Sequence, residues 1–176
     1  MTEQAKPLPS LTLVLGGQRS GKSAYAEGLL DGPGVYLATG HATDPDMAER
    51  IEAHQERRGQ GWVTVEEPLD LEKALKRAKE FHPGQPVLID SLGMWVSNML
   101  HDQRAPLVDC ERVVEAMVRH PAPVVAVSEE VGLGVIPMNA LARSFVDALG
   151  IVNQITATHA DRVVLVVAGL PKTLKV

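Results

Sequence analysis

The stretch Gly16-Gly17-Gln18-Arg19-Ser20-Gly21-Lys22-Ser23 decides how this chain folds. It follows an apolar, β-rich run, Leu11 to Leu15, and precedes a stretch of helix-forming residues. The pattern G-x-x-x-x-G-K-S between a strand and a helix predicts a phosphate-binding loop, because the glycines let backbone N–H groups surround a phosphate. The positive end of the helix dipole adds to the attraction for an anion. We therefore expect a nucleoside triphosphate here, with Lys22 reaching its outer phosphates and the Ser23 hydroxyl helping to hold Mg²⁺.

Further apolar runs follow the first, and longer amphipathic stretches separate them. They are Val35 to Ala38, Val87 to Ile89, Val124 to Val127 and Val163 to Val167. This alternation is typical of βαβ units and predicts a single-domain α/β fold, similar to P-loop NTPases, with a doubly wound, mostly parallel sheet and helices on both faces. Because the runs are uniformly apolar, these strands should be central in the sheet. The segment Trp62 to Val65 alternates polar and apolar residues and predicts either a short half-exposed strand or an irregular loop.

Length and composition restrict the class of protein. The chain has 176 residues, 45% of them hydrophobic, so we expect one packed domain over residues 11–176 after a flexible tail at residues 1–10. The net charge is −5 and no basic stripe alternates with aromatic residues, which argues against nucleic-acid binding. No apolar run reaches the roughly 18 residues that a membrane helix needs, so we expect no membrane insertion. Cys110 is the only cysteine, which excludes an internal disulfide and fits the reducing cytoplasm.

Polar residues follow the predicted strands at the edge where open α/β sheets bind ligands. They are Thr39 and Gly40, Asp90 and Ser91, and Ser128 to Glu130. Asp90 directly follows an apolar run, as a Walker B acid does, and such an acid orients Mg²⁺ directly or through water. Asp90 could instead be the N-cap of a helix that starts at Leu92.

Residues Thr43 to Gly59 have the start and stop signals of a helix. On such a helix Arg50 and Arg58 lie four residues on either side of His54, and Arg57 lies three residues away. Fixed cations around an imidazole keep more of it neutral, which is the nucleophilic form, and they also attract a polyphosphate. Taken alone, the same pattern is typical of a solvated helix residue.

An ordered set of motifs extends over nearly the whole chain after the tail. Besides the phosphate loop, the set comprises Tyr36-Leu37-Ala38-Thr39, Met47-Ala48-x-Arg50-Ile51-x-x-His54, Arg57-Arg58, Trp62-x-Thr64-x-Glu66-Glu67-Pro68, Asp90, Trp95-x-x-Asn98, Glu130-Val131-Gly132-x-Gly134-Val135-Ile136-Pro137, Ala142-Arg143-x-Phe145-x-Asp147-x-x-Gly150-x-x-Asn153-Gln154 and Ala168-Gly169. In these motifs the chain resembles the bifunctional adenosylcobinamide kinase and adenosylcobinamide-phosphate guanylyltransferase family of cobalamin biosynthesis. A phosphate loop occurs in very many proteins, whereas this ordered set does not.

The resemblance implies an enzyme that phosphorylates adenosylcobinamide with ATP or GTP and then transfers GMP from GTP to adenosylcobinamide phosphate. It implies that His54 is the covalent nucleophile. The phosphate loop itself makes Lys22 catalytic, through neutralisation of charge on the phosphates. The residues implied to contact guanine nucleotide are Gly16 to Ser23, Ala38, Thr39, Gly40, Gln55, Glu56, Arg57, Arg58, Glu66 and Asp90. An Asp90 that faces a guanine edge conflicts with the Walker B role, and both interpretations stay open. Glu66 could likewise be a solvated acid beside Glu67.

The resemblance also implies a homotrimer with active sites near subunit contacts. Many members of the family have asparagine where this chain has Glu129. A carboxylate that points into a phosphate site would repel the substrate, so either Glu129 faces away or the local chemistry differs, and we do not count it as catalytic. The segment Glu130 to Pro137 is either a lid or corrinoid-contacting loop, or an ordinary connection.

Two alternative functions stay open on the sequence. One is a monofunctional P-loop kinase of a small molecule, in which His54 only binds phosphate. The other is a nucleotide-driven switch or assembly ATPase. The chain contains no N-K-x-D sequence for guanine recognition, which weighs against a Ras-type switch.

Overall fold

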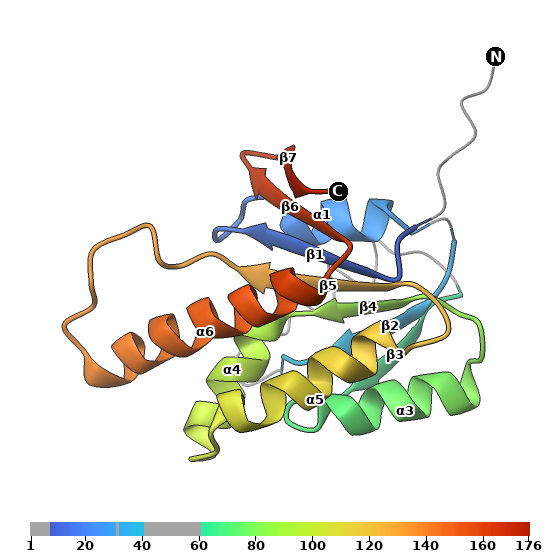
Figure 1. Cartoon of the computed structure of the whole chain (residues 1–176), viewed down its shortest axis with the longest axis horizontal. Coiled ribbons are helices and arrows are strands. Elements are labelled where there is room, and N and C mark those ends of the chain that lie inside the picture. The colour runs from blue at the N-terminus through green and yellow to red at the C-terminus, as the bar shows by residue number, and fades with distance from the viewer. Residues whose placement is uncertain (1–7, 31, 41–60) are drawn as a thin grey trace.

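The computed structural model describes residues 8–30, 32–40 and 61–176. In this part of the chain one sheet has the strand order β3-β2-β4-β5-β1-β6-β7 (Figure 1). The strands are β1 (Leu11–Gly16), β2 (Val35–Ala38), β3 (Val63–Glu66), β4 (Val87–Asp90), β5 (Val124–Glu129), β6 (Arg162–Val167) and β7 (Leu170–Lys175). Strands β1 to β6 pair in parallel, and β7 pairs antiparallel with β6. The carboxyl ends of β1 to β6 therefore share one edge of the sheet, called the carboxyl edge below.

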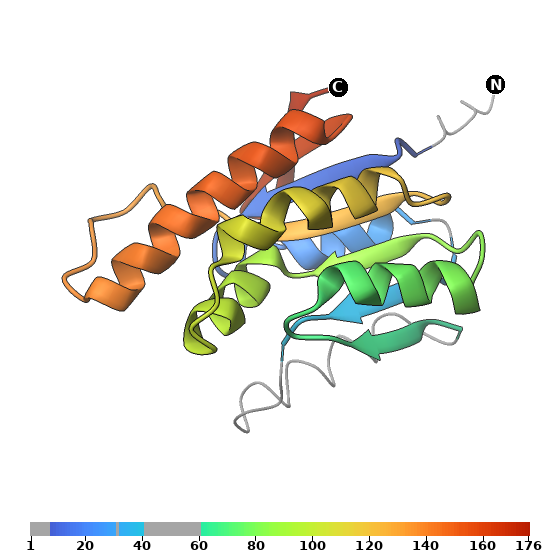
Figure 2. The ribbon, with the colours of Figure 1, turned by 60° about the horizontal axis from the view of Figure 1, so that its bottom comes forward.

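The described helices cover the sheet on both faces (Figures 1 and 2). They are α1 (Lys22–Gly28), α3 (Leu71–Phe81), α4 (Leu92–His101), α5 (Pro106–Val118) and α6 (Ala140–His159). Helix α1 packs on one face, and the other four helices pack on the opposite face. Within the described ranges, no helix combines the length and the apolar content needed to cross a membrane.

Alternation along the strands divides the core into two clusters. Leu11, Leu13 and Leu15 of β1 point to the cluster under α3 to α6, whereas Val14 points to the cluster under α1. Trp95 of α4 is fully buried in the larger cluster. Strands with apolar side chains on both faces need a cover on both, and this requirement gives the three-layer arrangement.

The structure confirms the α/β fold and the five strands expected from the apolar runs, with ends that differ by at most two residues. It also decides between the two interpretations of Trp62 to Val65, because β3 is a short strand whose side chains alternate between half-buried and exposed. Strand β7 was not expected, since its exposed residues form no apolar run. Its Pro171 is tolerated because β7 is an edge strand.

The packed chain begins before β1. Leu8 packs against the α1-side cluster, and the Ser10 carbonyl accepts a 2.8 Å hydrogen bond from the Val124 N–H. The helix expected over residues 43–59 lies outside the described residues.

Candidate functional site

The predicted phosphate loop joins the end of β1 to the start of α1, as the sequence motif requires. A Cβ atom at Gly16 would collide with the Ser20 hydroxyl and lie 2.8 Å from the Val166 carbonyl, so only glycine fits beside β6. Gly21 has a φ of 93°, which L-residues rarely adopt. The two glycines therefore allow the chain to reverse sharply and to lie against the sheet.

Two neighbouring segments hold the loop in place. The Gly169 N–H donates to the Ser20 carbonyl at 2.8 Å, and the Glu130 N–H donates to the Gly16 carbonyl at 3.1 Å. The Ala168-Gly169 motif is thus the turn between β6 and β7 that supports the loop. The Ser20 hydroxyl is buried and has no hydrogen-bond partner among the described residues. It is therefore a polar group at the loop that a ligand could satisfy.

Lys22, at the first position of α1, is only 8% exposed and faces a carboxylate. Its Nζ lies 3.4 Å from Oε1 of Glu129, the last residue of β5. Glu129 Oε2 accepts a hydrogen bond from the Ser91 hydroxyl at 3.0 Å. A Cβ atom at Gly93 would collide with this carboxylate, so Gly93 makes the room for it. The expectation that Glu129 could face away is wrong: its side chain points into the site.

Burial raises the pKa of Glu129. The Lys22 ammonium and the hydrogen bond from Ser91 act in the opposite direction, and the nearby Asp90 adds to the rise. Sequence reasoning did not count Glu129 as a functional residue. The signal that could have found it is a carboxylate at the end of the strand that pairs with β1.

Asp90 ends β4, and β5 separates β4 from the strand of the phosphate loop. At about 4.8 Å per strand, the β4 and β1 backbones are about 10 Å apart. Asp90 Oδ2 accepts a 3.1 Å hydrogen bond from the Tyr36 hydroxyl. The alternative of a helix cap is wrong, because the N-cap of α4 is Ser91, whose hydroxyl accepts from the Met94 N–H at 3.2 Å.

Strand register places Asp90 and Glu129 on the same face. Asp90 pairs with Val127, which is two residues before Glu129. Since alternate residues of a strand point to the same side, both carboxylates lie on the face that α1 covers.

At the end of β2, Ala38, Thr39 and Gly40 lie on the carboxyl edge, as expected. The Thr39 hydroxyl donates to the Ser91 carbonyl at 2.8 Å and accepts from the Ser91 N–H at 2.7 Å. The Asn98 side-chain amide donates to the Thr39 carbonyl at 2.7 Å. These bonds tie the end of β2 to the start of α4, so the Thr39 side chain has a structural role.

Trp95, the first residue of the Trp95-x-x-Asn98 motif, also has a structural role. Trp95 Nε1 donates to the Leu69 carbonyl at 2.8 Å, and the Asn98 amide reaches the Pro68 carbonyl at 3.2 Å. This pair fixes the segment that leaves β3. The motif therefore supports the chain segments that follow β2 and β3 at the carboxyl edge.

Glu66 is exposed at the end of β3. Four strand spacings, about 19 Å, separate β3 from β1, so one ligand would reach both only by extending along the edge. Glu67 has a different task, because its carboxylate accepts from the Leu69 and Asp70 N–H groups before α3. The remaining predicted site residues lie outside the described residues: Arg50, His54, Gln55, Glu56, Arg57 and Arg58.

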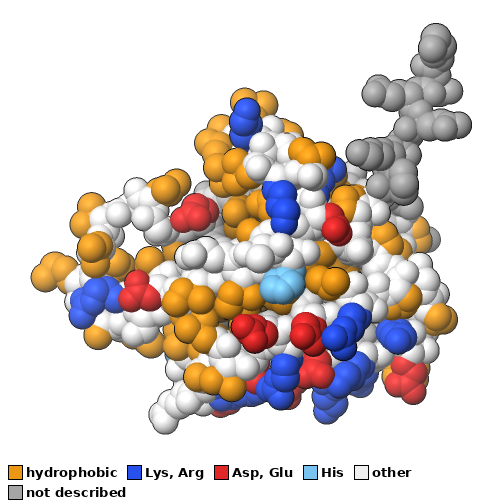
Figure 3. Space-filling model, viewed as in Figure 1, with side chains coloured by type: hydrophobic (Ala, Val, Ile, Leu, Met, Phe, Trp, Pro, Cys, Tyr) orange, Lys and Arg blue, Asp and Glu red, His pale blue; other side chains and the backbone are white. Residues whose placement is uncertain are grey.

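The connection from β5 to α6 projects from the body of the protein and carries apolar side chains into solvent (Figure 3). Its most exposed apolar residues are Leu133, Val135, Ile136 and Met138. The Arg143 guanidinium of α6 donates to the Pro137 and Met138 carbonyls, which anchors the end of this connection.

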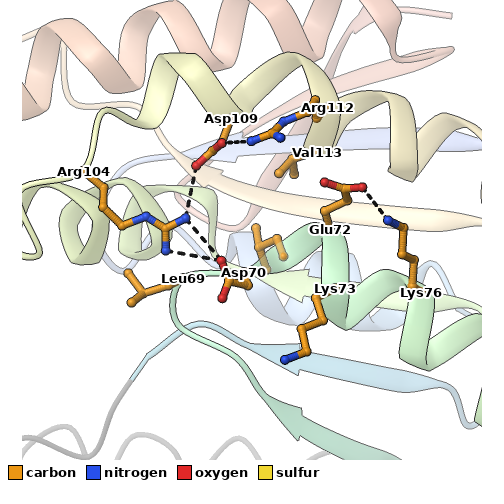
Figure 4. Close-up of a pocket in the computed structure, with 10 residues that line it drawn as sticks. Leu69, Asp70, Glu72, Lys73, Lys76, Arg104, Asp109, Arg112 and Val113 are labelled. Carbon is orange, nitrogen blue, oxygen red and sulfur yellow. Dashed lines mark hydrogen bonds and ion pairs between the residues drawn. The ribbon is translucent and has the colours of Figure 1, made fainter.

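A charged pocket lies between α3 and α5, on the face opposite to α1 (Figure 4). The Arg104 guanidinium donates to Asp70 and to Asp109, at 3.2 Å in each case, and Arg112 also pairs with Asp109. These four side chains pair with one another, whereas the pocket also contains Lys73, for which the described residues provide no ion-pair partner.

Comparison with known proteins shows the family of this chain. The family model described as cobinamide kinase / cobinamide phosphate guanyltransferase matches residues 12–174. The chain is 41% identical to the bifunctional adenosylcobalamin biosynthesis protein CobP of Pseudomonas aeruginosa over 168 residues, 93% of this chain and 96% of the relative. It is 36% identical to the bifunctional adenosylcobalamin biosynthesis protein CobU of Escherichia coli, covering 94% of this chain and 99% of the relative.

Among solved structures, the flagellar accessory protein FlaH of Methanocaldococcus jannaschii superposes with a TM-score of 0.58. It covers 96% of this chain and 80% of its own, at 15% identity, so this likeness concerns the fold alone. The match to the family model extends from β1 to β7 and includes the phosphate loop and the carboxyl ends of β1 to β6. The chain therefore belongs to the cobinamide kinase / cobinamide phosphate guanyltransferase family.

Proposed function

We propose that this protein catalyses two consecutive reactions, phosphorylation of adenosylcobinamide and transfer of GMP from GTP to the product, adenosylcobinamide phosphate. The observation that carries the proposal is a phosphate loop with a buried lysine, Lys22, within a chain that belongs to the family throughout residues 12–174. The final product would be adenosylcobinamide-GDP.

In the first reaction, the hydroxyl of the aminopropanol arm attacks the γ-phosphorus of ATP or GTP. The bond to the bridging oxygen breaks, the nucleoside diphosphate leaves and the hydroxyl proton passes to water. Catalysis of this kind consists mainly of positioning and of charge neutralisation. The loop N–H groups would hold the phosphates, and the Lys22 ammonium would neutralise charge on the outer ones.

Mg²⁺ prefers oxygen ligands and is commonly held by one or two protein groups together with substrate phosphates. The residues present fit it, because Ser23 offers a hydroxyl at the first turn of α1 and Asp90 a half-buried carboxylate on the same face of the sheet. When bound, the ion would supply charge neutralisation at the phosphate oxygens.

In the second reaction, the imidazole of His54 attacks the α-phosphorus of GTP. Pyrophosphate leaves, and a phosphorus–nitrogen bond holds GMP on the protein. A phosphate oxygen of adenosylcobinamide phosphate then attacks the same phosphorus, which breaks that bond and restores the free histidine. The support is the sequence pattern of His54 with Arg50, Arg57 and Arg58, and the two-step transfer follows the general logic of a covalent nucleophile.

Labelling with GTP that carries radioactive α-phosphorus tests this proposal. Wild-type protein with Mg²⁺ should retain label after denaturation, and the adduct should be labile to acid and stable to base, since protonation makes imidazole a good leaving group. His54→Ala should lose the adduct, while the control His159→Ala, an exposed residue at the far end of α6, should keep it. A folded wild-type protein without an adduct would leave a monofunctional kinase, and an adduct in His54→Ala would exclude His54 as the nucleophile.

The role of Asp90 is open between metal and guanine, and Asp90→Asn distinguishes the two. If Asp90 organises Mg²⁺, the kinase reactions with ATP and with GTP should fall together. If Asp90 contacts guanine, the GTP reactions should fall selectively. Equal rates for variant and wild type with both nucleotides would exclude both roles.

We further infer a homotrimer in the cytoplasm. The exposed apolar side chains at residues 131–138 support a partner surface on the β5–α6 connection. Light scattering should give about three times the 18.9 kDa of one chain.

Burial raises the pKa of Cys110 to about 11, so its thiol stays protonated and inert, which fits a protein without disulfides.

A further inference from the structure

The Lys22–Glu129 pair raises a question about how a triphosphate gains access to the lysine. The ammonium group is buried and lies 3.4 Å from a carboxylate. Proposed binding at the phosphate loop needs the same ammonium for the outer phosphates. Both the carboxylate and the phosphate oxygens are negatively charged, so they would repel each other if both lay beside the same ammonium group.

The carboxylate of Glu129 is held in its place by several groups. The Ser91 hydroxyl donates to one of its oxygens, and the lysine faces the other. Gly93 lies against it, since a Cβ atom added at this position would come within 2.9 Å of the Glu129 carboxyl carbon. These contacts come from α1 and from the start of α4, and the acidic Asp90 at the end of β4 adds a second negative charge nearby. Such a carboxylate has little freedom to move aside.

We propose that Glu129 is a positioning residue that holds Lys22 over the phosphate loop in the nucleotide-free site and competes with the triphosphate for its ammonium group. This inference rests on the proposed binding of nucleotide at the loop. The lysine side chain is long and flexible, so a partner that fixes it before binding also prevents it from filling the loop or turning outward. The cost is a weaker affinity for nucleotide, because binding has to exchange one charged partner for another.

The variant Glu129→Gln keeps the shape of the side chain and removes its charge. We expect GTP to bind about tenfold more tightly to this variant than to the wild type, the scale of one charge-assisted hydrogen bond. A role limited to structure predicts no change or weaker binding. Titration with a fluorescent GTP analogue, first in EDTA and then with Mg²⁺, measures the dissociation constant.

The matched control is Glu130→Gln, which removes the same charge from the next residue, a half-buried glutamate whose carboxylate accepts from the Gly132 N–H at 2.8 Å. It should change the dissociation constant by less than about twofold. Unchanged or weaker binding by Glu129→Gln in EDTA overturns the inference. Weaker binding only with Mg²⁺ also overturns it, because the carboxylate then serves the metal. If the wild type binds no GTP in either condition, the proposed function itself fails.

A second measurement needs no nucleotide. Without its carboxylate partner, the Lys22 side chain is no longer held at the loop, and a lysine that is free to turn outward is more accessible to acylating reagents. Mass spectrometry should therefore find Lys22 acylated several-fold faster in Glu129→Gln than in the wild type, while the exposed Lys76 reacts at the same rate in both. Equal rates at Lys22 would contradict the proposed pair.

Discussion

Two carboxylates of this protein each face a lysine, and their pKa values shift in opposite directions. Glu72 lies 2.7 Å from Lys76 on the surface of α3, and this hydrogen bond and the lysine charge lower its pKa. Glu129 lies 3.4 Å from Lys22 at the carboxyl edge, and burial raises its pKa despite the lysine. Because the chemical groups are the same, the difference comes from the surroundings: water stabilises the charged pair on α3, whereas the loss of water outweighs the attraction at the site.

The comparison also separates charges that satisfy one another from charges that are available to a ligand. The network of Arg104 and Arg112 with Asp70 and Asp109 is solvent-accessible, and each of its charges faces an opposite one (Figure 4). At the site, Lys22 shares one sheet face with two carboxylates, Glu129 and Asp90. A cation in that position is coupled strongly to anything negative that enters, while the surface network is screened by salt.

The largest effect should come from Lys22→Ala. Loss of a preorganised charge at the outer phosphates should lower kinase turnover by about 100-fold or more. The fold should persist, because the carboxyl of Glu129 can take up a proton when its partner is gone. Circular dichroism and kinase assays check both points. Lys76→Ala is the control and should keep wild-type turnover, whereas near-normal turnover in folded Lys22→Ala would refute the assignment of the phosphate loop.

A smaller effect is expected for Gly93→Ala, which displaces the Glu129 carboxylate and keeps its charge. The added methyl group overpacks the site, so we expect a loss of about 1–3 kcal/mol in the free energy of unfolding, partly offset by a helix-propensity gain of about 1 kcal/mol. The control is Gly150→Ala in α6, where an added Cβ atom meets nothing within 4 Å. Urea unfolding should show that Gly150→Ala does not destabilise. Equal stability changes for the two variants would contradict the crowding at Gly93.

The pH dependence of stability should differ in sign between the two carboxylates. A raised pKa of Glu129 in the folded state means that the folded protein binds protons more readily than the unfolded chain does. The contribution of Glu129 to stability is therefore present below the ordinary pKa of 4.5 and is lost as the pH rises through the folded-state pKa. The lowered pKa of Glu72 contributes stability above 4.5 that is lost as pH falls. Urea unfolding in EDTA at several pH values measures the free energy of unfolding. Relative to the wild type, this free energy should rise for Glu129→Gln as the pH increases, and it should rise for Glu72→Gln as the pH decreases. The same trend in both variants would refute the contrast.

The smallest effect is expected for Arg104→Ala. Exposed ion pairs contribute little, so the free energy of unfolding should fall by less than about 1 kcal/mol, and by less still at high salt. Nucleotide binding should match the wild type, because the network lies on the face opposite to α1. A loss of GTP affinity in this variant would show that the α3–α5 pocket is coupled to the site.

Local patterns in the sequence were sufficient to predict the elements that form the site. Uniformly apolar runs identify central strands, since only strands covered on both faces need them. The glycine-rich loop before Lys22 identifies the strand-to-helix turn, since its glycines permit the backbone conformation that such a turn needs. Both predictions hold because the decisive interactions are close in sequence. The edge strand β7 escaped this reasoning because an exposed strand has no apolar signature.

Only the tertiary structure decided which residues meet. Strand order placed β5 between β4 and β1, so Glu129 and not Asp90 came to face Lys22. Burial then decided the direction of the Glu129 pKa, and the gap left by Gly93 decided where the carboxylate lies. Contacts between residues that are more than a hundred positions apart follow from the path of the crossovers and from the packing of helices on the sheet. A sequence pattern read along the chain identifies which groups can carry charge, and the fold determines which of them lose their water and pair.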